Sequence, residues 1–332
     1  MRIGIVTPAA PESRSGNQVT AVRWARILRR LGHRVLISRT YSGEEFDLLI
    51  ALHARRSFDS IDRFGSAHPD RVLIVALTGT DLYRDLKQSL KAQRSLDIAT
   101  RIIALQPRAL DELRPAWRRK TRVIHQSVSP FDRRRARATE KNFDVCVVGH
   151  LRREKDPLRT AMAARHLPES SQVQVIHLGS ALAVTEATRA RLEMVTNRRY
   201  KWLGEVSPSK VAAVMSKSRL FVISSRMEGG ANALGEAIVA GLPVLASRIP
   251  GSIGILGNDY PGYFEVGDTR GLARLILRCE TEPRFLADLT SLCNNLVALF
   301  DPSREQSAWL GLLDELELES ISVPDAVGPS RQ

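Results

Sequence analysis

The sequence has no long hydrophobic run. Its apolar stretches fall well short of the roughly 18–20 residues that cross a membrane as a helix. The apolar start, MRIGIVT, ends at Pro8 and is followed by a charge at Glu12, a pattern typical of a first β-strand and not of a signal peptide. We therefore expect a cytoplasmic protein without a membrane span.

Cysteine is scarce, and several cofactor motifs are missing. Cys146, Cys279 and Cys293 are widely spaced and belong to no CxxC motif, so neither a disulfide framework nor a zinc site is expected, which fits a reducing cytosol. No GxGxxG follows the first apolar run and GxxxxGK is absent, which argues against a nicotinamide dehydrogenase and a P-loop NTPase. We expect no cofactor.

Acidic residues are the minority charge. The chain has 36 Asp and Glu against 49 Lys and Arg, a net charge of +13. Such a charge favours anionic partners, namely nucleic acid, a membrane surface or phosphorylated small molecules. The one dense basic run is RRRAR at 133–137, so solvated helix faces with a basic linker are the plainer alternative.

Short apolar runs alternate with helical patterns through both halves of the chain. A length of 332 residues and a hydrophobic content of 43% suit two domains, each with its own core. Strands are predicted at 2–7, 33–38, 47–52, 71–77, 101–105 and 121–125, and again at 143–149, 173–179, 200–204, 219–224, 243–247 and 263–266. Helices are predicted between them, among them 18–31, 184–196, 232–240, 271–280 and 284–299. This alternation indicates an α/β protein with a doubly wound parallel sheet in each half.

The domain boundaries follow from the point where the alternation stops. We expect a Rossmann-like domain at 1–128, a polar linker at 129–141 and a second Rossmann-like domain at 142–303. A helix at 304–320 is expected to cross back to the N-terminal domain, and 321–332 are expected to be a disordered tail. Two such domains facing each other form a cleft, and ligands bind at the carboxyl ends of their strands.

Three loops that follow strands of the N-terminal half contain candidate anion-binding residues. They are Gly16 after the first strand, His53, Arg55 and Arg56 after the third, and Thr78, Thr80 and Asp81 after the fourth. A helix N-terminus and clustered cations both favour an anion. Each loop also has a structural alternative as a turn, a helix cap or a solvated surface.

The C-terminal half begins with a strand followed by GHLRREKDP. His150, Arg152, Arg153 and Lys155 in this loop would neutralise a diphosphate, which gathers negative charge as a sugar–phosphate bond breaks. A solvated basic loop is the alternative interpretation.

A later stretch, SSRMEGGANALGEAIVAGLPVLAS, places two carboxylates around a helix start. Glu228 lies in the loop, the glycines at 229–230 permit a tight backbone, and the amides at 232–234 favour a phosphate. Glu236 lies one turn into an apolar helix, where a semi-buried carboxylate needs partners. Helix capping and a sugar-nucleotide clamp are the two alternatives for this pair.

These motifs resemble those of family 4 glycosyltransferases, which have the GT-B fold of two Rossmann-like domains facing a cleft. The matching motifs are the E-x7-E pair at Glu228 and Glu236 followed by EAIVAGLPVLAS, and VVGHLRREKDP, and the resemblance covers nearly the whole chain. In that family the lysine matched by Lys155 binds the donor diphosphate. His150 stands where the family usually has an arginine, and Arg152 would take over that contact.

A narrower resemblance is to the selenosugar synthases of selenoneine biosynthesis. It rests on GIVTPAAPESRSGNQVTAVRWARILRRLGHRV, ALHARRS, ALTGTDLYRDL and GHLRREKDP. The resemblance implies transfer of the sugar of UDP-N-acetylglucosamine, or of UDP-glucose, to selenophosphate, with release of UDP and phosphate. It also implies functional coupling to a selenophosphate synthase and a selenoneine synthase, and no nucleic-acid partner.

The implied site has three groups of residues. We expect catalytic roles for Glu228, Lys155, Arg152 and His53, donor binding by Gly16, His150, Glu205, Gly229, Gly230, Asn232, Ala233, Leu234 and Glu236, and selenophosphate binding by Arg55, Arg56, Thr78, Thr80 and Asp81. Selenium in selenophosphate already bears negative charge, so it needs positioning more than a general base. FDRRR and LTGTD each supply one isolated acid, so metal-independent catalysis by protein cations and helix amides is expected.

Two other functions fit the same sequence. One is a conventional glycosyltransferase with an oxygen acceptor. The other is a non-catalytic two-domain protein that binds a sugar nucleotide or, through its basic charge, nucleic acid.

Overall fold

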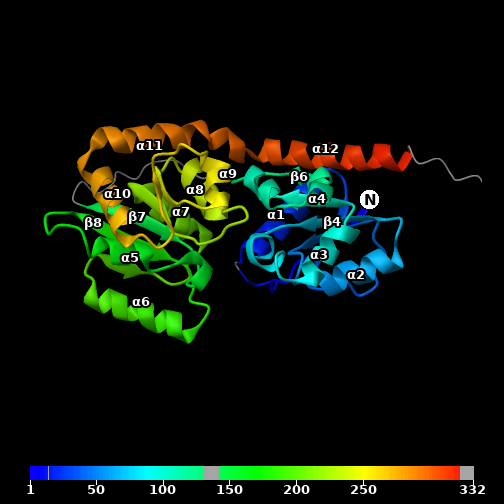
Figure 1. Ribbon diagram of the computed structural model, residues 1–332, viewed down its shortest axis with the longest axis horizontal. Coiled ribbons are helices and arrows are strands. Elements are labelled where there is room, and N and C mark those ends of the chain that lie inside the picture. The colour runs from blue at the N-terminus through cyan, green and yellow to red at the C-terminus, as the bar shows by residue number, and fades with distance from the viewer. Residues whose placement is uncertain (14, 130–141, 322–332) are drawn as a thin grey trace, which may run out of the picture.

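The computed structural model describes residues 1–13, 15–129 and 142–321 and shows two α/β domains side by side (Figure 1). The N-terminal domain is coloured blue to cyan and the C-terminal domain green to orange. All but the first residue of the predicted linker at 129–141, and residues 322–332 of the predicted tail, lie outside the described residues.

A six-stranded parallel sheet forms the centre of the N-terminal domain, in the order β2-β1-β3-β4-β5-β6. All five residues of β3 are buried, as expected of a strand covered by helices on both faces. The strands are β1 (Arg2–Val6), β2 (Arg34–Ser38), β3 (Leu48–Leu52), β4 (Val72–Ala76), β5 (Arg101–Ala104) and β6 (Thr121–Val123).

Separate hydrophobic clusters pack on the two faces of this sheet. One contains Trp24 and Leu28 of α1, and the other contains Phe64 of α2 and Leu96 of α3. The helical elements are α1 (Gly16–Arg30), α2 (Phe58–Ala67), the π-helical turn η1 (Asp81–Asp85), α3 (Leu90–Ile98), the 3-10 turn η2 (Pro107–Glu112) and α4 (Pro115–Arg119).

The C-terminal domain repeats the architecture with a parallel sheet in the order β12-β11-β10-β7-β8-β9. Its strands are β7 (Phe143–Val148), β8 (Val173–Leu178), β9 (Tyr200–Trp202), β10 (Leu220–Ile223), β11 (Val244–Ser247) and β12 (Tyr263–Phe264). Its helical elements are η3 (Arg153–Lys155), α5 (Arg159–Ala164), α6 (Val184–Thr196), α7 (Pro208–Lys217), α8 (Asn232–Val239), α9 (Pro250–Leu256), α10 (Thr269–Thr281), α11 (Pro283–Asn295) and η4 (Val297–Phe300). The two sheets confirm the predicted fold class.

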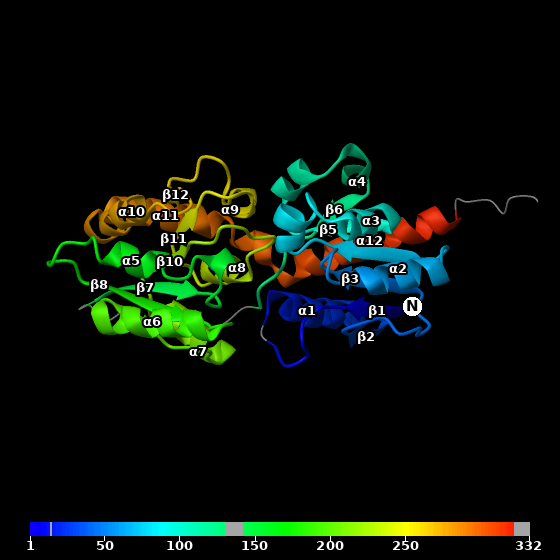
Figure 2. The same ribbon diagram turned by 60° about the horizontal axis from the view of Figure 1, so that its bottom comes forward.

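The chain crosses between the domains at two adjacent places. The Val128 amide donates to the Phe300 carbonyl oxygen (3.0 Å), so the two crossing segments run side by side. Beyond them α12 (Pro302–Ile321), coloured orange to red, lies along the N-terminal domain (Figures 1 and 2). There Trp309 is fully buried, with its ring centroid 5.0 Å from that of Trp24. The N-terminal domain therefore contains sequence from both sides of the C-terminal domain.

Two helices depart from the sequence prediction. The helix predicted at 284–299 ends at Asn295, and η4 follows because Phe300 must turn into the crossing segment to pair with Val128. The helix α9 was not predicted, because its sequence PGSIGIL has two glycines and two β-branched residues, which are weak helix formers.

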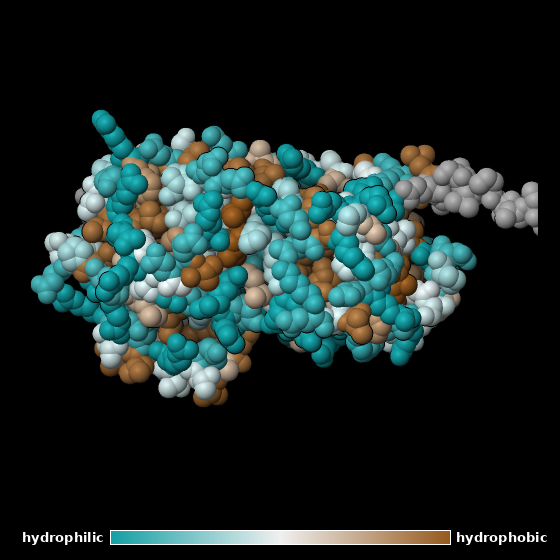
Figure 3. All heavy atoms as spheres, viewed as in Figure 1, coloured by the Kyte–Doolittle hydropathy of each residue, from teal (hydrophilic) through white to brown (hydrophobic). Residues whose placement is uncertain are grey.

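The face of the molecule in Figure 3 is mainly hydrophilic, with hydrophobic side chains in small groups. Val184, Leu192 and Val195 are exposed apolar residues of α6. Across the part of the chain that the structure describes, no helix has both the length and the apolarity to cross a bilayer.

Candidate active site

A pocket of about 180 Å³ lies between the two domains. Loops after β1, β3 and β4 line it from the N-terminal domain, and loops after β7 and β10 from the C-terminal domain, all at the carboxyl ends of strands where such folds bind ligands. Seven predicted site residues line this pocket: Gly16, His53, Arg56, Thr78, Thr80, Arg152 and Glu228.

His53 is held in a fixed orientation at the end of β3. Its backbone is in the left-handed region (φ 75°), which is uncommon for a residue other than glycine. Its Nδ1 accepts from the Arg56 amide (3.2 Å), so Nε2 donates to the Thr80 hydroxyl (3.0 Å). Burial lowers the pKa of His53, so the ring is neutral at pH 7. His53 therefore orients the Thr80 hydroxyl and adds no positive charge to the pocket.

Asp81 and Arg55 do not line the pocket, which corrects the prediction that they bind the acceptor anion. Asp81 is fully buried, and its carboxylate accepts from the amides of Thr78 and Gly79 (both 2.9 Å). A carboxylate repels an anion, and this one already accepts hydrogen bonds from its own loop. Asp81 therefore shapes the loop after β4. The Arg55 side chain pairs instead with Asp85 (2.9 Å).

Gly229 and Gly230, predicted to contact the donor, also have a packing role between the domains. A Cβ at position 229 would lie 2.5 Å from the Thr78 carbonyl carbon and 2.7 Å from the Gly79 nitrogen. A Cβ at position 230 would lie 2.5 Å from the Leu105 Cβ. The two glycines therefore allow the loop after β10 to pack against the backbone of the other domain.

Lys155 and Glu228 form an ion pair on the C-terminal side of the pocket. The Lys155 ammonium donates to Glu228 Oε1, which also accepts from the Ser225 hydroxyl (2.6 Å). Glu228 is only 7% exposed, so water screens the pair little. The two residues meet because they follow β7 and β10, which are neighbours in the sheet.

Two arginines from different domains line the pocket. Arg152 follows β7, and its Nε atom is buried without a hydrogen-bond partner among the described residues. Arg56 of the N-terminal domain also lines the pocket and is otherwise exposed. A buried N–H without a partner is costly unless a ligand satisfies it, so an anion would bind here with both arginines nearby.

Only Gly16 of the nine predicted donor-binding residues lines the pocket, and the other eight do not. His150 interacts with the Ser180 hydroxyl (2.7 Å), and Glu205 is exposed after β9. The amide of Leu234 donates to the Ala231 carbonyl oxygen (2.9 Å), so it is not available to a phosphate, which corrects its predicted role. The amides of Asn232 and Ala233, at the start of α8, precede this first intrahelical bond.

Glu236 lies one turn into α8 and is half-buried. Burial raises the pKa of Glu236 to about 7, against the opposing attraction of the Arg23 guanidinium. The carboxylate is therefore close to half-ionised at neutral pH. A ligand that donates hydroxyl groups to it would favour the ionised form.

The sequence did not single out Arg23, Arg84 or Gln126. Arg84 pairs with Glu154 across the domain interface (3.0 Å), and Arg23 donates to Asn232 of the other domain (3.1 Å). Arginines on helices are usually solvated, so their sequence neighbourhood gives no signal, and only the packing of the domains brings them to the interface.

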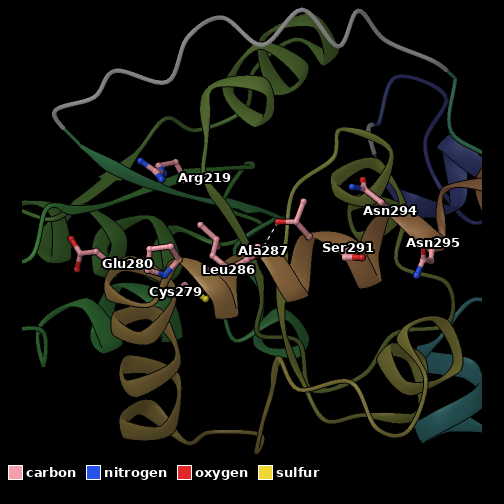
Figure 4. A pocket seen from close by; sticks show the side chains of 10 residues that line it. Arg219, Cys279, Glu280, Leu286, Ala287, Ser291, Asn294 and Asn295 are labelled. Carbon is pink, nitrogen blue, oxygen red and sulfur yellow. Dashed lines mark hydrogen bonds between the residues drawn. The ribbon is translucent and has the colours of Figure 1, made fainter.

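A larger pocket of about 520 Å³ lies in the C-terminal domain, at the junction of α10 and α11 (Figure 4). Arg219 and Glu280 border it beside the start of β10 and the end of α10. This is the edge where strands begin, opposite the edge that binds ligands in such sheets. None of the predicted site residues lines it.

The arrangement of the domains is similar to that of several solved structures. Anabaena HepE in complex with UDP-glucose superposes with a TM-score of 0.75 at 17% identity, covering 95% of this chain and 100% of that one. Sucrose-phosphate synthase from Thermosynechococcus elongatus gives 0.75 at 18% identity, covering 96% and 99%. At these identities the similarity establishes the GT-B fold.

Residues 128–291 match the family model of glycosyl transferases group 1. This segment is therefore similar to the glycosyl transferases of group 1. The chain also aligns with the Escherichia coli UDP-Gal:alpha-D-GlcNAc-diphosphoundecaprenol alpha-1,3-galactosyltransferase, at 27% identity over 161 residues. That alignment covers 47% of this chain and 41% of the relative, so the match spans less than half of either protein.

Proposed function

We propose that the protein transfers the sugar of a UDP-sugar, UDP-N-acetylglucosamine or UDP-glucose, to selenophosphate. The products are a 1-selenosugar, UDP and phosphate, as the resemblance to selenosugar synthases implies. The observation that supports this acceptor best is the small, cationic pocket between the domains.

The donor half of the proposal rests on the C-terminal domain. Lys155 and the amides at the start of α8 would hold the diphosphate, and Glu236 would accept hydrogen bonds from the ribose hydroxyls. The HepE structures contain UDP or UDP-glucose, and the E. coli relative is named for a UDP-galactose donor. Both support a UDP-sugar here. The diphosphate charge would be balanced by protein cations and helix amides without a metal.

The acceptor half rests on the size and charge of the pocket. At about 180 Å³ it is smaller than the roughly 300–1,000 Å³ pockets that hold drug-sized ligands. Arg56 and Arg152 provide two cations, and Thr78 and Thr80 provide hydroxyl groups. A small tetrahedral oxyanion fits this pocket better than a lipid or an oligosaccharide does.

The proposed chemistry needs no deprotonation of the acceptor. The selenium lone pair forms the bond to the anomeric carbon while the bond from that carbon to the diphosphate oxygen breaks, and UDP leaves with the electron pair. Water then cleaves the Se–P bond, giving phosphate and the selenol. Arg56 and Arg152 lower the repulsion between the two anionic substrates, and the neutral His53 keeps the Thr80 hydroxyl oriented.

Incubation with UDP-N-acetylglucosamine or UDP-glucose, with and without selenophosphate, tests the proposal. We expect UDP release to require selenophosphate and a selenium-77 resonance of a carbon-bound product to appear. Equal UDP release without selenophosphate, or release driven only by an oxygen acceptor, would show a conventional glycosyltransferase. Donor binding without turnover under all conditions would show a binding protein.

Replacing Glu236 with alanine should weaken UDP-sugar binding about tenfold, because the ribose loses a carboxylate acceptor. In the native protein, affinity should be highest above pH 7 and should fall as the pH is lowered through about 7, where the carboxylate becomes protonated. Calorimetric titration with UDP-N-acetylglucosamine suits this measurement, because its diphosphate does not titrate in that range. Unchanged affinity in Glu236→Ala would remove this residue from the donor site.

A further inference from the structure

Arg23 is a residue of the N-terminal domain that reaches the start of α8 in the C-terminal domain. It lies on α1, and its side chain is 15% exposed. Its Nη2 donates to Asn232 Oδ1 (3.1 Å), and Asn232 is the first residue of α8. Arg23 is thus a direct polar link between the first helix of one domain and the proposed donor-binding helix of the other.

The opposite side of the Arg23 guanidinium is anchored at the two crossing segments. Its Nη1 donates to the Ser127 carbonyl oxygen (3.0 Å), and its Nε lies 3.4 Å from Glu305 Oε2. Glu305 is itself fixed, because it accepts from the Trp24 indole (2.8 Å) and from the Ser127 amide (2.8 Å). These contacts set the position and direction of the guanidinium before any ligand binds.

Gln126 makes a second, parallel link. In the amide orientation that satisfies its neighbours, it donates to the Gly230 carbonyl oxygen and to Asn232 Oδ1 (both 3.1 Å) and accepts from Arg23 Nη2 (2.8 Å). Asn232 therefore receives hydrogen bonds from two buried or nearly buried groups of the N-terminal domain. Such shared contacts restrict the side chain to one conformation.

Arg23 also acts on the charge of Glu236. Its guanidinium attracts that carboxylate, and among the described residues no other charged group is a main influence on the pKa of Glu236. The Cys146 thiol on β7 also interacts electrostatically with Glu236. Burial raises the pKa of this thiol, so it stays neutral. Glu305 lies beyond Arg23 and is paired with it.

We propose that Arg23 is a positioning residue of the donor site, which holds Asn232 at the start of α8 and keeps the Glu236 carboxylate ready to accept the ribose hydroxyls. The inference rests on the proposed function, since it assumes that α8 and Glu236 bind a UDP-sugar. It adds that Arg23, a residue of the N-terminal domain that lies outside the pocket, helps to complete the donor site.

The test compares Arg23→Gln with Arg26→Gln, which removes the same charge from the exposed face of the same helix. We expect Arg23→Gln to raise the Kd for UDP-N-acetylglucosamine and the KM for the donor about tenfold, with kcat and the KM for selenophosphate nearly unchanged. The pH below which donor affinity falls should rise, because Glu236 loses the cation that favours its ionised form. Arg26→Gln should behave as the native protein does.

Equal donor affinity and an equal pH profile in the two variants would overturn the inference. Arg23→Gln leaves Glu305 buried without its cation, which lowers the stability of the protein. The double variant Arg23→Gln/Glu305→Gln removes both charges and therefore serves as the folded variant in which donor affinity is measured. Its donor affinity should stay low, and native affinity in this double variant would also overturn the inference. If the native protein itself binds neither UDP-N-acetylglucosamine nor UDP-glucose, the proposed function fails.

Discussion

Gly229→Ala should reduce kcat/KM at least about a hundredfold, because it prevents the two domains from meeting at the pocket. The added Cβ would lie 2.5 Å from the Thr78 carbonyl carbon and 2.7 Å from the Gly79 nitrogen. Both are backbone atoms on a loop fixed by Asp81, so they cannot rotate away as a flexible side chain would. The backbone of Gly229 is not in the left-handed region, so the effect is steric and alanine strains no dihedral angle.

Steady-state kinetics and thermal melting together measure this effect. The melting temperature of Gly229→Ala should stay close to the native value, because the clash lies between the domains and not within either core. Gly311→Ala on α12 is the matched control, since no atom of the described residues lies within 4 Å of its added Cβ. Native activity in Gly229→Ala would show that the approach of the loops is not needed for turnover.

Lys155→Met should lower turnover about a thousandfold and also destabilise the protein by about 3 kcal/mol. Activity falls because the cation expected to balance the leaving diphosphate is lost. Stability falls because Glu228, 7% exposed, then keeps the Ser225 hydroxyl (2.6 Å) but no cation among the described residues to pair with its buried charge. Urea unfolding measures the second effect independently of substrate.

The double variant Lys155→Met/Glu228→Gln separates the two effects. It removes both buried charges, so most of the lost stability should return while turnover stays low. Lys210→Met on the exposed face of α7 controls for the loss of one positive charge. Recovery of turnover together with stability would show that Lys155 serves only to pair Glu228.

The strands and most helices follow from the sequence because hydrophobic periodicity is a local property. LLIAL at 48–52 is apolar throughout, and it is a fully buried strand. The pocket was also predictable in part, since polar loops after parallel strands meet at one edge of a sheet and His53, Thr78 and Arg152 do meet there.

The functions of individual polar and glycine residues were harder to predict, because they depend on what the other domain places opposite. Asp81 has the sequence context of a ligand-facing loop, yet it binds its own backbone. Gly229 has the context of a phosphate loop, yet its missing side chain makes room for Thr78 and Gly79. Arg23 is indistinguishable in sequence from the solvated arginines of the same helix.

The position of α12 has a consequence for synthesis of the chain. Trp309, Leu312, Leu313 and Leu316 complete the core around Trp24, although the whole C-terminal domain separates them from it in sequence. During translation the core of the N-terminal domain therefore stays incomplete, with this apolar face exposed to solvent, until the C-terminal domain has been synthesised. Folding from the N-terminus in domain order, which is usual during translation, is here left incomplete until α12 emerges.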